Sequence, residues 1–267
     1  MRNNKYQLFA FMGFVSGVVG SLISEIIPMF NLFYHIFHVA VWSSVYTIAI
    51  ALGLFWAIEI YNRKPQLNFN ILKRAILSGI IAGSISGSIA QAIYLINPHS
   101  EFFRAICWGL MGALVGWRLS HSIPNLGVKK GIFAGSIGGL AGGFLFVLII
   151  TSKILPQFIG RFLGIGILGL ALGLALVIVE VLFREAYLEI IWNKYEKTSI
   201  SLGLKPVTIG GKNDDIYVKD LPSESVIVSF NKGKINYLES ATKRNLELKD
   251  GSKITIGRIE IVVHANT

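Results

Sequence analysis

The sequence predicts a polytopic α-helical membrane bundle of six helices, arranged as three parallel helical-hairpin repeats, followed by a small C-terminal all-β sandwich. The first observation is compositional: the 267 residues are 53% hydrophobic and only 15% charged, with the charges lying between long apolar stretches. The second is a glycine pattern that starts at Lys73 and returns at Lys129. The third is a change near residue 197 to short alternating runs punctuated by Gly and Pro, which is typical of strands.

Six apolar stretches are each long enough to cross a membrane. About 20 consecutive apolar residues span the roughly 30 Å hydrocarbon core of a bilayer. The first stretch is too long for a signal peptide and lacks a small-residue cleavage pattern, so we expect it to remain as a helix. The predicted spans are 7–28, 37–60, 74–96, 102–120, 130–152 and 158–182. They form a transmembrane domain over residues 1–183, with hairpins at 7–60, 73–120 and 129–182.

Basic residues are unequally distributed between the two ends of these stretches. Lys and Arg accumulate in the cytoplasmic loops of membrane proteins. One side carries only Arg104, Lys153 and Arg161. The other side carries Arg2, Lys5, Arg63, Lys64, Lys73, Arg74, Arg118, Lys129, Lys130, Arg184, Lys194 and Lys197. We therefore expect both termini in the cytoplasm, in a bacterial inner membrane. The net charge of +10 is then a topology signal and an attraction to lipid headgroups, with no nucleic acid as partner.

Glycine spacing predicts that the helices pack closely and that hairpins are repeated. A Gly at every fourth position lies along one face of a helix and lets another backbone approach. Residues 73–83 return as 129–139, and the fourth stretch matches the sixth. Gly13 and Gly17 match Gly79 and Gly83, so the first hairpin is a worn third copy and a pseudo-threefold bundle follows. The predicted helix-packing residues are Gly79, Gly83, Gly87, Gly109, Gly112, Gly116, Gly131, Gly135, Gly139, Gly143, Gly166, Gly169 and Gly173.

Charged residues within the six stretches lie only near the helix ends. Glu59 and Glu180 are near the cytoplasmic boundary, and Arg104 and Arg161 are near the outer one. A charge at mid-depth costs at least about 2.5–3.5 kcal/mol and usually marks a transport site. We therefore expect these four residues to be interfacial anchors whose side chains reach the headgroups. Serines in the second and third stretches leave a narrow polar pathway open as an alternative.

The residue types needed for catalysis do not form a recognisable arrangement. The sequence has no Ser-His-Asp, Cys-His or paired-carboxylate pattern and no phosphate-binding loop. A single cysteine, Cys107, excludes a disulfide framework and a Cys-based metal site. The remaining candidate ligands are more typical of the membrane interface: Glu25, His35, His38, His99 and Glu101. We expect a non-enzymatic protein without cofactor or metal.

The sixth stretch continues past the membrane as an apolar stripe. Leu182, Ala186 and Ile190 recur at helical spacing, with Arg184 and Glu189 on the other side. This pattern predicts an amphipathic helical connector over residues 184–196. Residues 197–267 then form a separate cytoplasmic β domain, with strands expected at 206–210, 215–218, 226–230, 235–238, 246–248, 253–256 and 259–263.

Two segments of the β domain carry a family resemblance. Val207-Thr208-Ile209-Gly210-Gly211 with the following 214–218, and Leu248–Gly257 before the last strand, resemble the opening and closing signatures of a forkhead-associated (FHA) domain. The resemblance covers about residues 202–264 and implies a β-sandwich that binds phosphothreonine peptides. Gly211 replaces the family's arginine, however, and Glu224 would repel phosphate. The implied module is a degenerate FHA domain that binds protein without phosphate. Candidate contacts are Lys212, Ser223, Ser225, Lys243, Arg244 and Asn245.

Together these patterns favour one function and leave a second open. The first is a membrane-anchored scaffold or signalling adaptor that presents the FHA-like module to a cytoplasmic protein. The absence of mid-depth charge favours it over the second, a small-solute channel or transporter in which the β domain is a regulatory cap. The expected partners are the lipid bilayer, a cytoplasmic protein and further copies of this chain.

Overall fold

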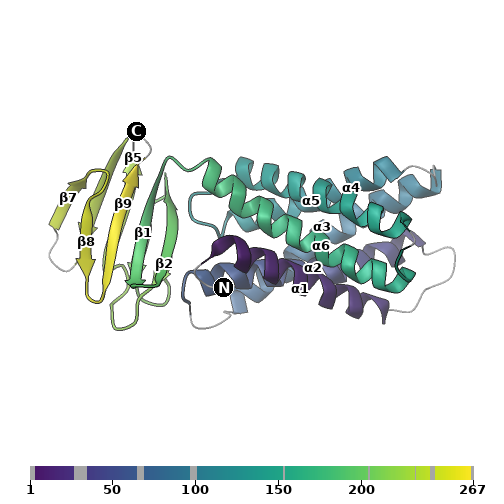
Figure 1. The fold of residues 1–267 in the computed structure, drawn as a ribbon, viewed down its shortest axis with the longest axis horizontal. Coiled ribbons are helices and arrows are strands. Elements are labelled where there is room, and N and C mark those ends of the chain that lie inside the picture. The colour runs from purple at the N-terminus through teal and green to yellow at the C-terminus, as the bar shows by residue number, and fades with distance from the viewer. Residues whose placement is uncertain are drawn as a thin grey trace.

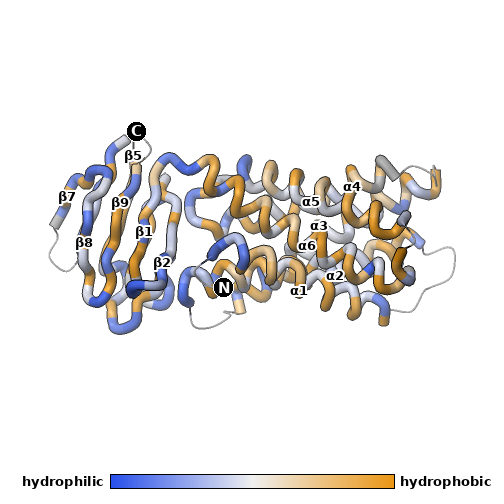
Figure 2. The backbone as a smooth tube through the Cα atoms, in the orientation of Figure 1, coloured by the Kyte–Doolittle hydropathy of each residue, from blue (hydrophilic) through white to orange (hydrophobic). Residues whose placement is uncertain are grey.

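The computed structural model describes residues 4–26, 35–64, 69–96, 101–152, 154–203, 205–231, 233–240 and 244–265. The molecule is elongated, with a helical bundle at one end and a β-sandwich at the other (Figure 1). Apolar residues dominate the bundle, whereas apolar and polar residues alternate in the sandwich (Figure 2).

Six helices form the bundle, as predicted. Five of them are long and apolar enough to cross a membrane. The remaining helix, the fourth along the chain, has a shorter apolar part, Ala105–Ser120. The chain therefore has the features of a multi-pass membrane protein. The helices are α1 (Lys5–Glu25), α2 (His35–Tyr61), α3 (Phe69–Ile96), α4 (Glu101–Ser120), α5 (Val128–Thr151) and α6 (Gln157–Leu182).

The helices pack in a closed ring that follows the chain order. Each helix contacts its two neighbours in sequence, and α6 returns to contact α1. In addition, α2, α4 and α6 touch one another across the middle of the ring. These three helices supply most of the large, fully buried side chains of the bundle core, including Ile50, Leu54, Met111, Leu119, Leu168 and Leu172. The other three helices present apolar side chains such as Val19, Ile80 and Leu140 outward, where lipid would contact them.

Glycines allow the closest approaches between neighbouring helices. Where α5 meets α4, a Cβ placed on Gly112 or on Gly135 would overlap the carbonyl oxygen of the other residue. Gly13 and Gly169 have the same relation where α1 meets α6. The other predicted positions also face a neighbouring helix: Gly79 (against Ile48), Gly83 (Ser44), Gly87 (Ser43), Gly109 (Leu140), Gly116 and Gly131 (each other), Gly139 and Gly143 (Trp108), Gly166 (Phe14) and Gly173 (Phe9).

Within the described residues, the sandwich contains nine strands in two sheets. One sheet has the order β2-β1-β9-β8 and the other β4-β3-β5-β6-β7; the neighbours are antiparallel except for β3 and β4. Leu188, Ile190, Val207, Val226 and Val263 belong to the apolar core that the two sheets share. The strands are β1 (Ala186–Asn193), β2 (Glu196–Leu202), β3 (Val207–Gly210), β4 (Ile216–Tyr217), β5 (Val226–Asn231), β6 (Lys234–Glu239), β7 (Arg244–Leu248), β8 (Lys253–Ile256) and β9 (Ile259–Ala265).

The helical connector predicted for residues 184–196 is wrong. Helix α6 ends at Leu182, and β1 begins four residues later, between β2 and β9. Ala186, Leu188 and Ile190 are fully buried while the residues between them are partly exposed, which is the two-residue period of a strand. The sequence misled because apolar residues on both faces of β1 also fit a helical period over so short a run. The sandwich therefore begins almost directly at the end of α6, and a fragment starting at residue 197 would lack a central strand.

Both sheets stand edge-on against the end of the bundle. In the first sheet β2 lies nearest to the helices and β8 farthest away (Figure 1). In the second sheet the edge strand β4 contacts the bundle, because the Tyr217 amide donates to the Asn62 carbonyl at 3.3 Å. The opposite edge of that sheet, β7, is remote from the helices (Figure 1). One end of the bundle is therefore covered by protein.

Candidate functional site

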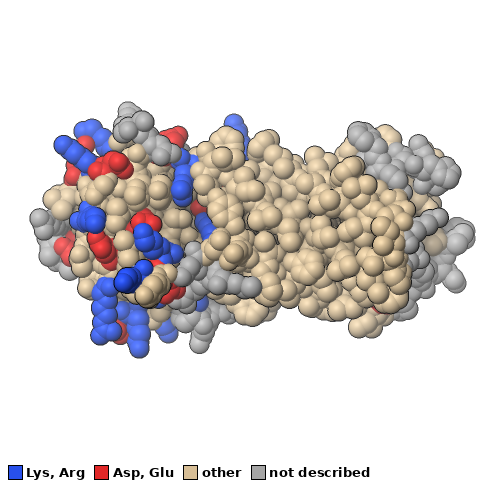
Figure 3. All heavy atoms as spheres, in the orientation of Figure 1, with Lys and Arg blue, Asp and Glu red and all other residues tan. Residues whose placement is uncertain are grey.

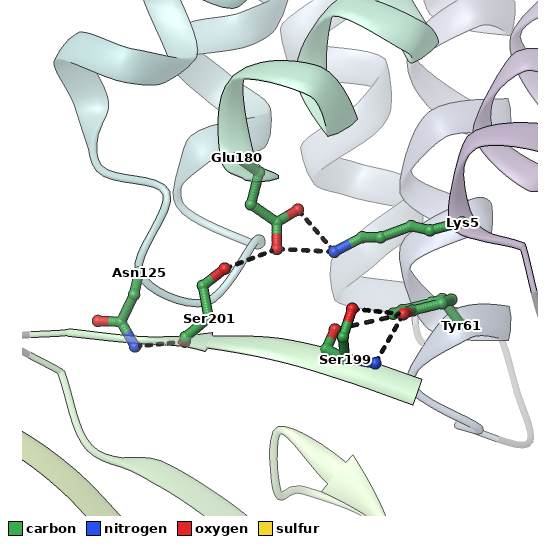
Figure 4. A network of polar contacts seen from close by, with 6 residues as sticks. All are labelled: Lys5, Tyr61, Asn125, Glu180, Ser199 and Ser201. Atoms are coloured by element: carbon green, nitrogen blue, oxygen red, sulfur yellow. Dashed lines mark hydrogen bonds and ion pairs between the residues drawn. The ribbon is translucent and has the colours of Figure 1, made fainter. Parts of the chain in front are cut away.

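The junction between bundle and sandwich is the most extensive polar network that joins distant parts of the described chain. The end of α2, the turn between α4 and α5, and the end of α6 all reach strand β2, and the start of α1 joins them through Glu180 (Figure 4). The network consists of Lys5, Tyr61, Asn125, Glu180, Ser199 and Ser201. It fixes how the sandwich sits on the bundle.

A buried ion pair lies at the centre of this junction. Lys5 Nζ lies 2.7 and 2.6 Å from the two carboxylate oxygens of Glu180, and Ser201 Oγ donates to the same carboxylate at 3.1 Å. The side chain of Glu180 is 5% exposed and that of Lys5 is 11% exposed. A buried charge is tolerated only when it is paired and hydrogen-bonded, so each of these two groups depends on the other.

The prediction that Glu59 and Glu180 are headgroup anchors is wrong, because both side chains are buried. The sandwich and the helix ends enclose the position from which a carboxylate would otherwise reach water. Glu59 instead lies 4.0 Å from Lys64. At the opposite end of the bundle Arg161 is partly exposed and pairs with Glu25 at 2.9 Å, and the side chain of Arg104 lies outside the described part of the structure.

Side chains from the bundle bind the free edge of β2. The Tyr61 hydroxyl accepts a hydrogen bond from the Ser199 amide at 2.8 Å and donates to the Ser199 carbonyl at 3.3 Å. The Asn125 amide group donates to the carbonyls of Ser201 and Lys205, both at 3.1 Å, and accepts from the Lys205 amide at 3.0 Å. An edge strand otherwise exposes a row of unpaired donors and acceptors. The bundle thus takes the place of the next strand.

A cation also links the two parts near the end of α2. The guanidinium of Arg63 lies 3.9 Å from the ring centroid of Trp192 on β1 and forms an ion pair with Glu196 on β2. These contacts could not be expected from sequence, because a basic residue beside an apolar stretch is typical of a topology marker. Tyr61 and Asn125 were missed because their partners lie more than 70 positions away in the chain.

Replacing Tyr61 with phenylalanine is expected to loosen β2 without unfolding the chain. The Ser199 amide would lose its acceptor while staying beside the bundle, which costs about 1–3 kcal/mol for a buried group. Amide hydrogen exchange across β2 should become at least about tenfold faster. Tyr6→Phe is the matched control, because the Tyr6 hydroxyl makes no hydrogen bond to a described residue. Unchanged protection of Ser199 in Tyr61→Phe would contradict the role assigned to Tyr61.

Three of the six predicted partner-binding residues, Lys212, Ser223 and Ser225, lie in loops at one end of the sandwich. Gly211 packs against Ser223, so the turn after β3 touches the loop before β5. The amide of Ser240, just after β6, donates to the Ser225 carbonyl at 3.0 Å, which adds the turn that precedes β7. Lys212 is exposed on the first of these loops. Ser223 and Ser225 therefore lie close together, as two contacts on a single binding surface would have to.

The other three predicted contacts are less closely placed. Asn245 is exposed on β7, where it pairs with Leu238 of β6. Lys243 lies outside the described residues, and the side chain of Arg244, the first residue of β7, is likewise outside them. We therefore define the loop cluster as residues 211–215, 221–225 and 240.

A buried carboxylate that the sequence did not single out holds the loop cluster together. Asp214 is 3% exposed, and its carboxylate accepts a hydrogen bond from the Glu224 amide at 2.8 Å. The adjacent Asp215 accepts from the amide of Thr208 at 3.0 Å. The exposed Glu224 adds a further negative charge. These hydrogen bonds hold the loops of the cluster together.

A cavity lies in the half of the bundle that is remote from the sandwich. It has a volume of about 380 Å³ and is lined by five aromatic residues from four helices together with Gln91, Cys107 and Arg161. The aromatic rings are those of Trp42, Tyr46, Tyr94, Trp108 and Phe146, and neighbouring rings among them contact one another with centroids 5.1–5.8 Å apart. We call this cavity the aromatic vestibule.

Comparison with known proteins gives no independent indication of function. No protein-family model, no curated protein and no solved structure matches the chain. Conclusions about activity therefore depend on the junction, the loop cluster and the cavities themselves.

Proposed function

We propose that the chain is a membrane-anchored scaffold or signalling adaptor that presents a cytoplasmic, FHA-like protein-binding module. The observation that carries the proposal is the edge-on attachment of the sandwich. Tyr61, Asn125 and Asn62 bind its two near edges, while the buried pair of Lys5 and Glu180 secures the contact. Such a connection holds the module in one orientation. A scaffold needs this fixed orientation, whereas a domain that moves independently would not have it.

Two features support a phosphate-independent FHA-like module. The first is the sandwich itself, in which three loops at one end form a continuous surface around Ser223 and Ser225. The second is the exposed Glu224 on that surface, which would repel a phosphoryl group, with the buried Asp214 bound to its amide. A protein partner that carries exposed basic or neutral polar groups fits this surface better than a phosphopeptide.

The three-hairpin repeat is part of the same proposal. The glycine contacts follow a cyclic rule, since α3 packs on α2, α5 packs on α4, and α1 packs on α6. The inner positions are taken by α2, α4 and α6, the second helix of each hairpin. Both facts are what a pseudo-threefold bundle requires. Its role here is to be a rigid anchor.

The orientation of the molecule follows from charge. Lys5, Arg63, Lys64, Lys129 and Lys130 flank the end of the bundle that carries the sandwich. Basic residues at helix ends favour the cytoplasmic side. The proposed location is therefore a bacterial inner membrane with the sandwich in the cytoplasm.

Site-specific photocrosslinking in native membranes tests the proposal. A photoreactive residue at Ser223 should capture a soluble protein, and the adduct should persist after phosphatase treatment. The same probe at Lys253, on the exposed remote edge strand β8, is the control and should give little or none of that adduct. Capture of lipid alone at Ser223 would refute the scaffold. An adduct that phosphatase removes would refute phosphate independence.

The aromatic vestibule favours a second candidate function, a small-solute channel or transporter with the sandwich as a regulatory cap. Aromatic rings beside Gln91 and Arg161 could accommodate a small amphiphilic solute. Towards the sandwich, however, fully buried aliphatic side chains such as Leu54, Leu119 and Leu172 fill the ring. Flux of ions or small solutes into liposomes that contain the purified chain would favour this candidate over the scaffold. Absence of flux together with crosslinking at Ser223 would exclude it.

A further inference from the structure

A second and larger cavity lies between the bundle and the sandwich, on the side of the turn between α4 and α5. This cleft has a volume of about 790 Å³. Its walls come from residues 120–130, from the link between α6 and β1, and from the connection between β2 and β3. The cleft thus opens where the helices emerge from the predicted membrane, at the depth of the lipid headgroups.

Basic side chains outnumber acidic side chains in the lining of the cleft. The acidic residues are Glu180, Glu185 and Asp215; Lys5 neutralises Glu180, whereas Asp215 accepts hydrogen bonds from the neutral Thr208 and keeps its charge. The basic residues are Lys129, Lys130, Arg184 and Lys205. In space-filling view, Lys and Arg gather at the border between the sandwich and the nearly uncharged bundle (Figure 3). The cleft therefore offers uncompensated positive charge.

Two of these cations are available to a ligand. Lys129, at the start of α5, and Lys205, between β2 and β3, are exposed, and neither forms an ion pair with a described residue. Lys130 donates to the Phe183 carbonyl at 2.8 Å and so closes one wall of the cleft. One available cation thus belongs to the bundle and the other to the sandwich.

Large apolar side chains stand exposed near Lys129 and at the link between α6 and β1. Val128 is 41% exposed, Phe133 50%, Leu182 71% and Phe183 49%. Phe133 and Phe183 contact each other edge to face, with ring centroids 6.3 Å apart. Cations that adjoin exposed apolar and aromatic groups are typical of a surface that meets phosphate and hydrocarbon together. A soluble anion would need only the cations.

We propose that this cleft binds the headgroup of an anionic phospholipid. Lys129 and Lys205 contact its phosphate, and its acyl chains lie along Phe133 and Leu182. Basic pockets at the cytoplasmic ends of membrane helices suit such headgroups. Because the two lysines belong to different parts of the molecule, the bound lipid would join bundle to sandwich. This inference goes beyond the proposed scaffold and does not depend on a protein partner.

Thermal unfolding of the full chain in a neutral detergent tests the proposal. The probes are short-chain phosphatidylglycerol, short-chain phosphatidylcholine and glycerol phosphate. Phosphatidylglycerol at about 100 times its Kd should raise Tm by about 5–10 °C, because a ligand of the folded state stabilises it by mass action. Phosphatidylcholine and glycerol phosphate should not. An equal rise with phosphatidylcholine would refute charge recognition, and an equal rise with glycerol phosphate would refute the lipid as the source of the phosphate.

Charge variants locate the effect. Lys129→Gln with Lys205→Gln should abolish the rise, and Lys129→Arg with Lys205→Arg should retain it. Lys219→Gln with Lys249→Gln removes the same charge from exposed loops of the sandwich and is the matched control. A rise that persists in Lys129→Gln with Lys205→Gln would overturn the proposal. Lys129→Gln with Lys205→Gln could also lower Tm without lipid. In that case, loss of the phosphatidylglycerol effect in Lys129→Arg with Lys205→Arg would equally overturn the proposal.

Discussion

Replacing Lys5 with methionine is expected to lower the free energy of unfolding by about 3–5 kcal/mol, the usual cost of leaving one member of a buried ion pair alone. The carboxylate of Glu180, 5% exposed, would retain Ser201 as its hydrogen-bond donor but lose its counter-charge. Methionine preserves the apolar part of the contact with Tyr61, over whose ring the Lys5 ammonium lies at 4.8 Å. The loss would therefore report mainly on charge.

The companion substitution separates charge from packing. Lys5→Met combined with Glu180→Leu should be more stable than Lys5→Met alone, because no buried charge remains. Chemical unfolding in detergent, monitored by circular dichroism, gives the free energies of unfolding of Lys5→Met, Glu180→Leu and the double variant. The control is Lys253→Met, which breaks an exposed pair with Glu260 and should cost about 1 kcal/mol or less. A double variant as unstable as the sum of its single variants would contradict the assignment of a buried, mutually dependent pair.

Replacing Gly112 with alanine is expected to cost about 1–3 kcal/mol even though alanine is the better helix former. The new methyl group would overlap the carbonyl oxygen of Gly135, and since backbone cannot rotate away, α4 and α5 would have to separate. Gly135→Ala should behave in the same way. In the double variant the two losses should add incompletely, because one separation of the helices already accommodates both methyl groups.

Gly160→Ala is the matched control for the glycine contacts. A Cβ on Gly160 in α6 would meet only Ile149 Cγ2, at an ordinary 3.8 Å. This substitution should be neutral or slightly stabilising in thermal unfolding. If Gly112→Ala and Gly160→Ala had the same effect, glycine spacing would reflect composition alone and not close helix contact.

Most of the bundle could be predicted from sequence because both signals that define it are local. Apolar length marks each helix, and glycine spacing marks the face that another backbone approaches, as between Gly112 and Gly135. The shorter α4 can still be predicted as a helix of the bundle, because the apolar stretches before and after it in the chain are long enough to cross a membrane. The strands of the sandwich from β3 onward follow their alternating pattern for the same reason.

The candidate site could not be predicted because it depends on contacts between distant residues. Glu180 is a typical interfacial glutamate until β2 is placed above it. Ala186–Asn193 fits either a helix or a strand, and only pairing with β2 and β9 decides between them. The loop cluster was partly predictable, since Ser223 and Ser225 lie in one turn, but Asp214 acquires its role only when it meets the Glu224 amide.

The closure of the ring has a consequence for how the protein is made. Gly13 on the first helix and Gly169 on the sixth form the last contact that closes the ring. A ribosome adds about 5–20 residues per second, so α1 waits in the membrane for many seconds before α6 is synthesised. During that interval its glycine face is open to other helices. The sandwich is translated after α6 and binds Glu180, the partner of Lys5, so its folding would lock a ring that is already closed.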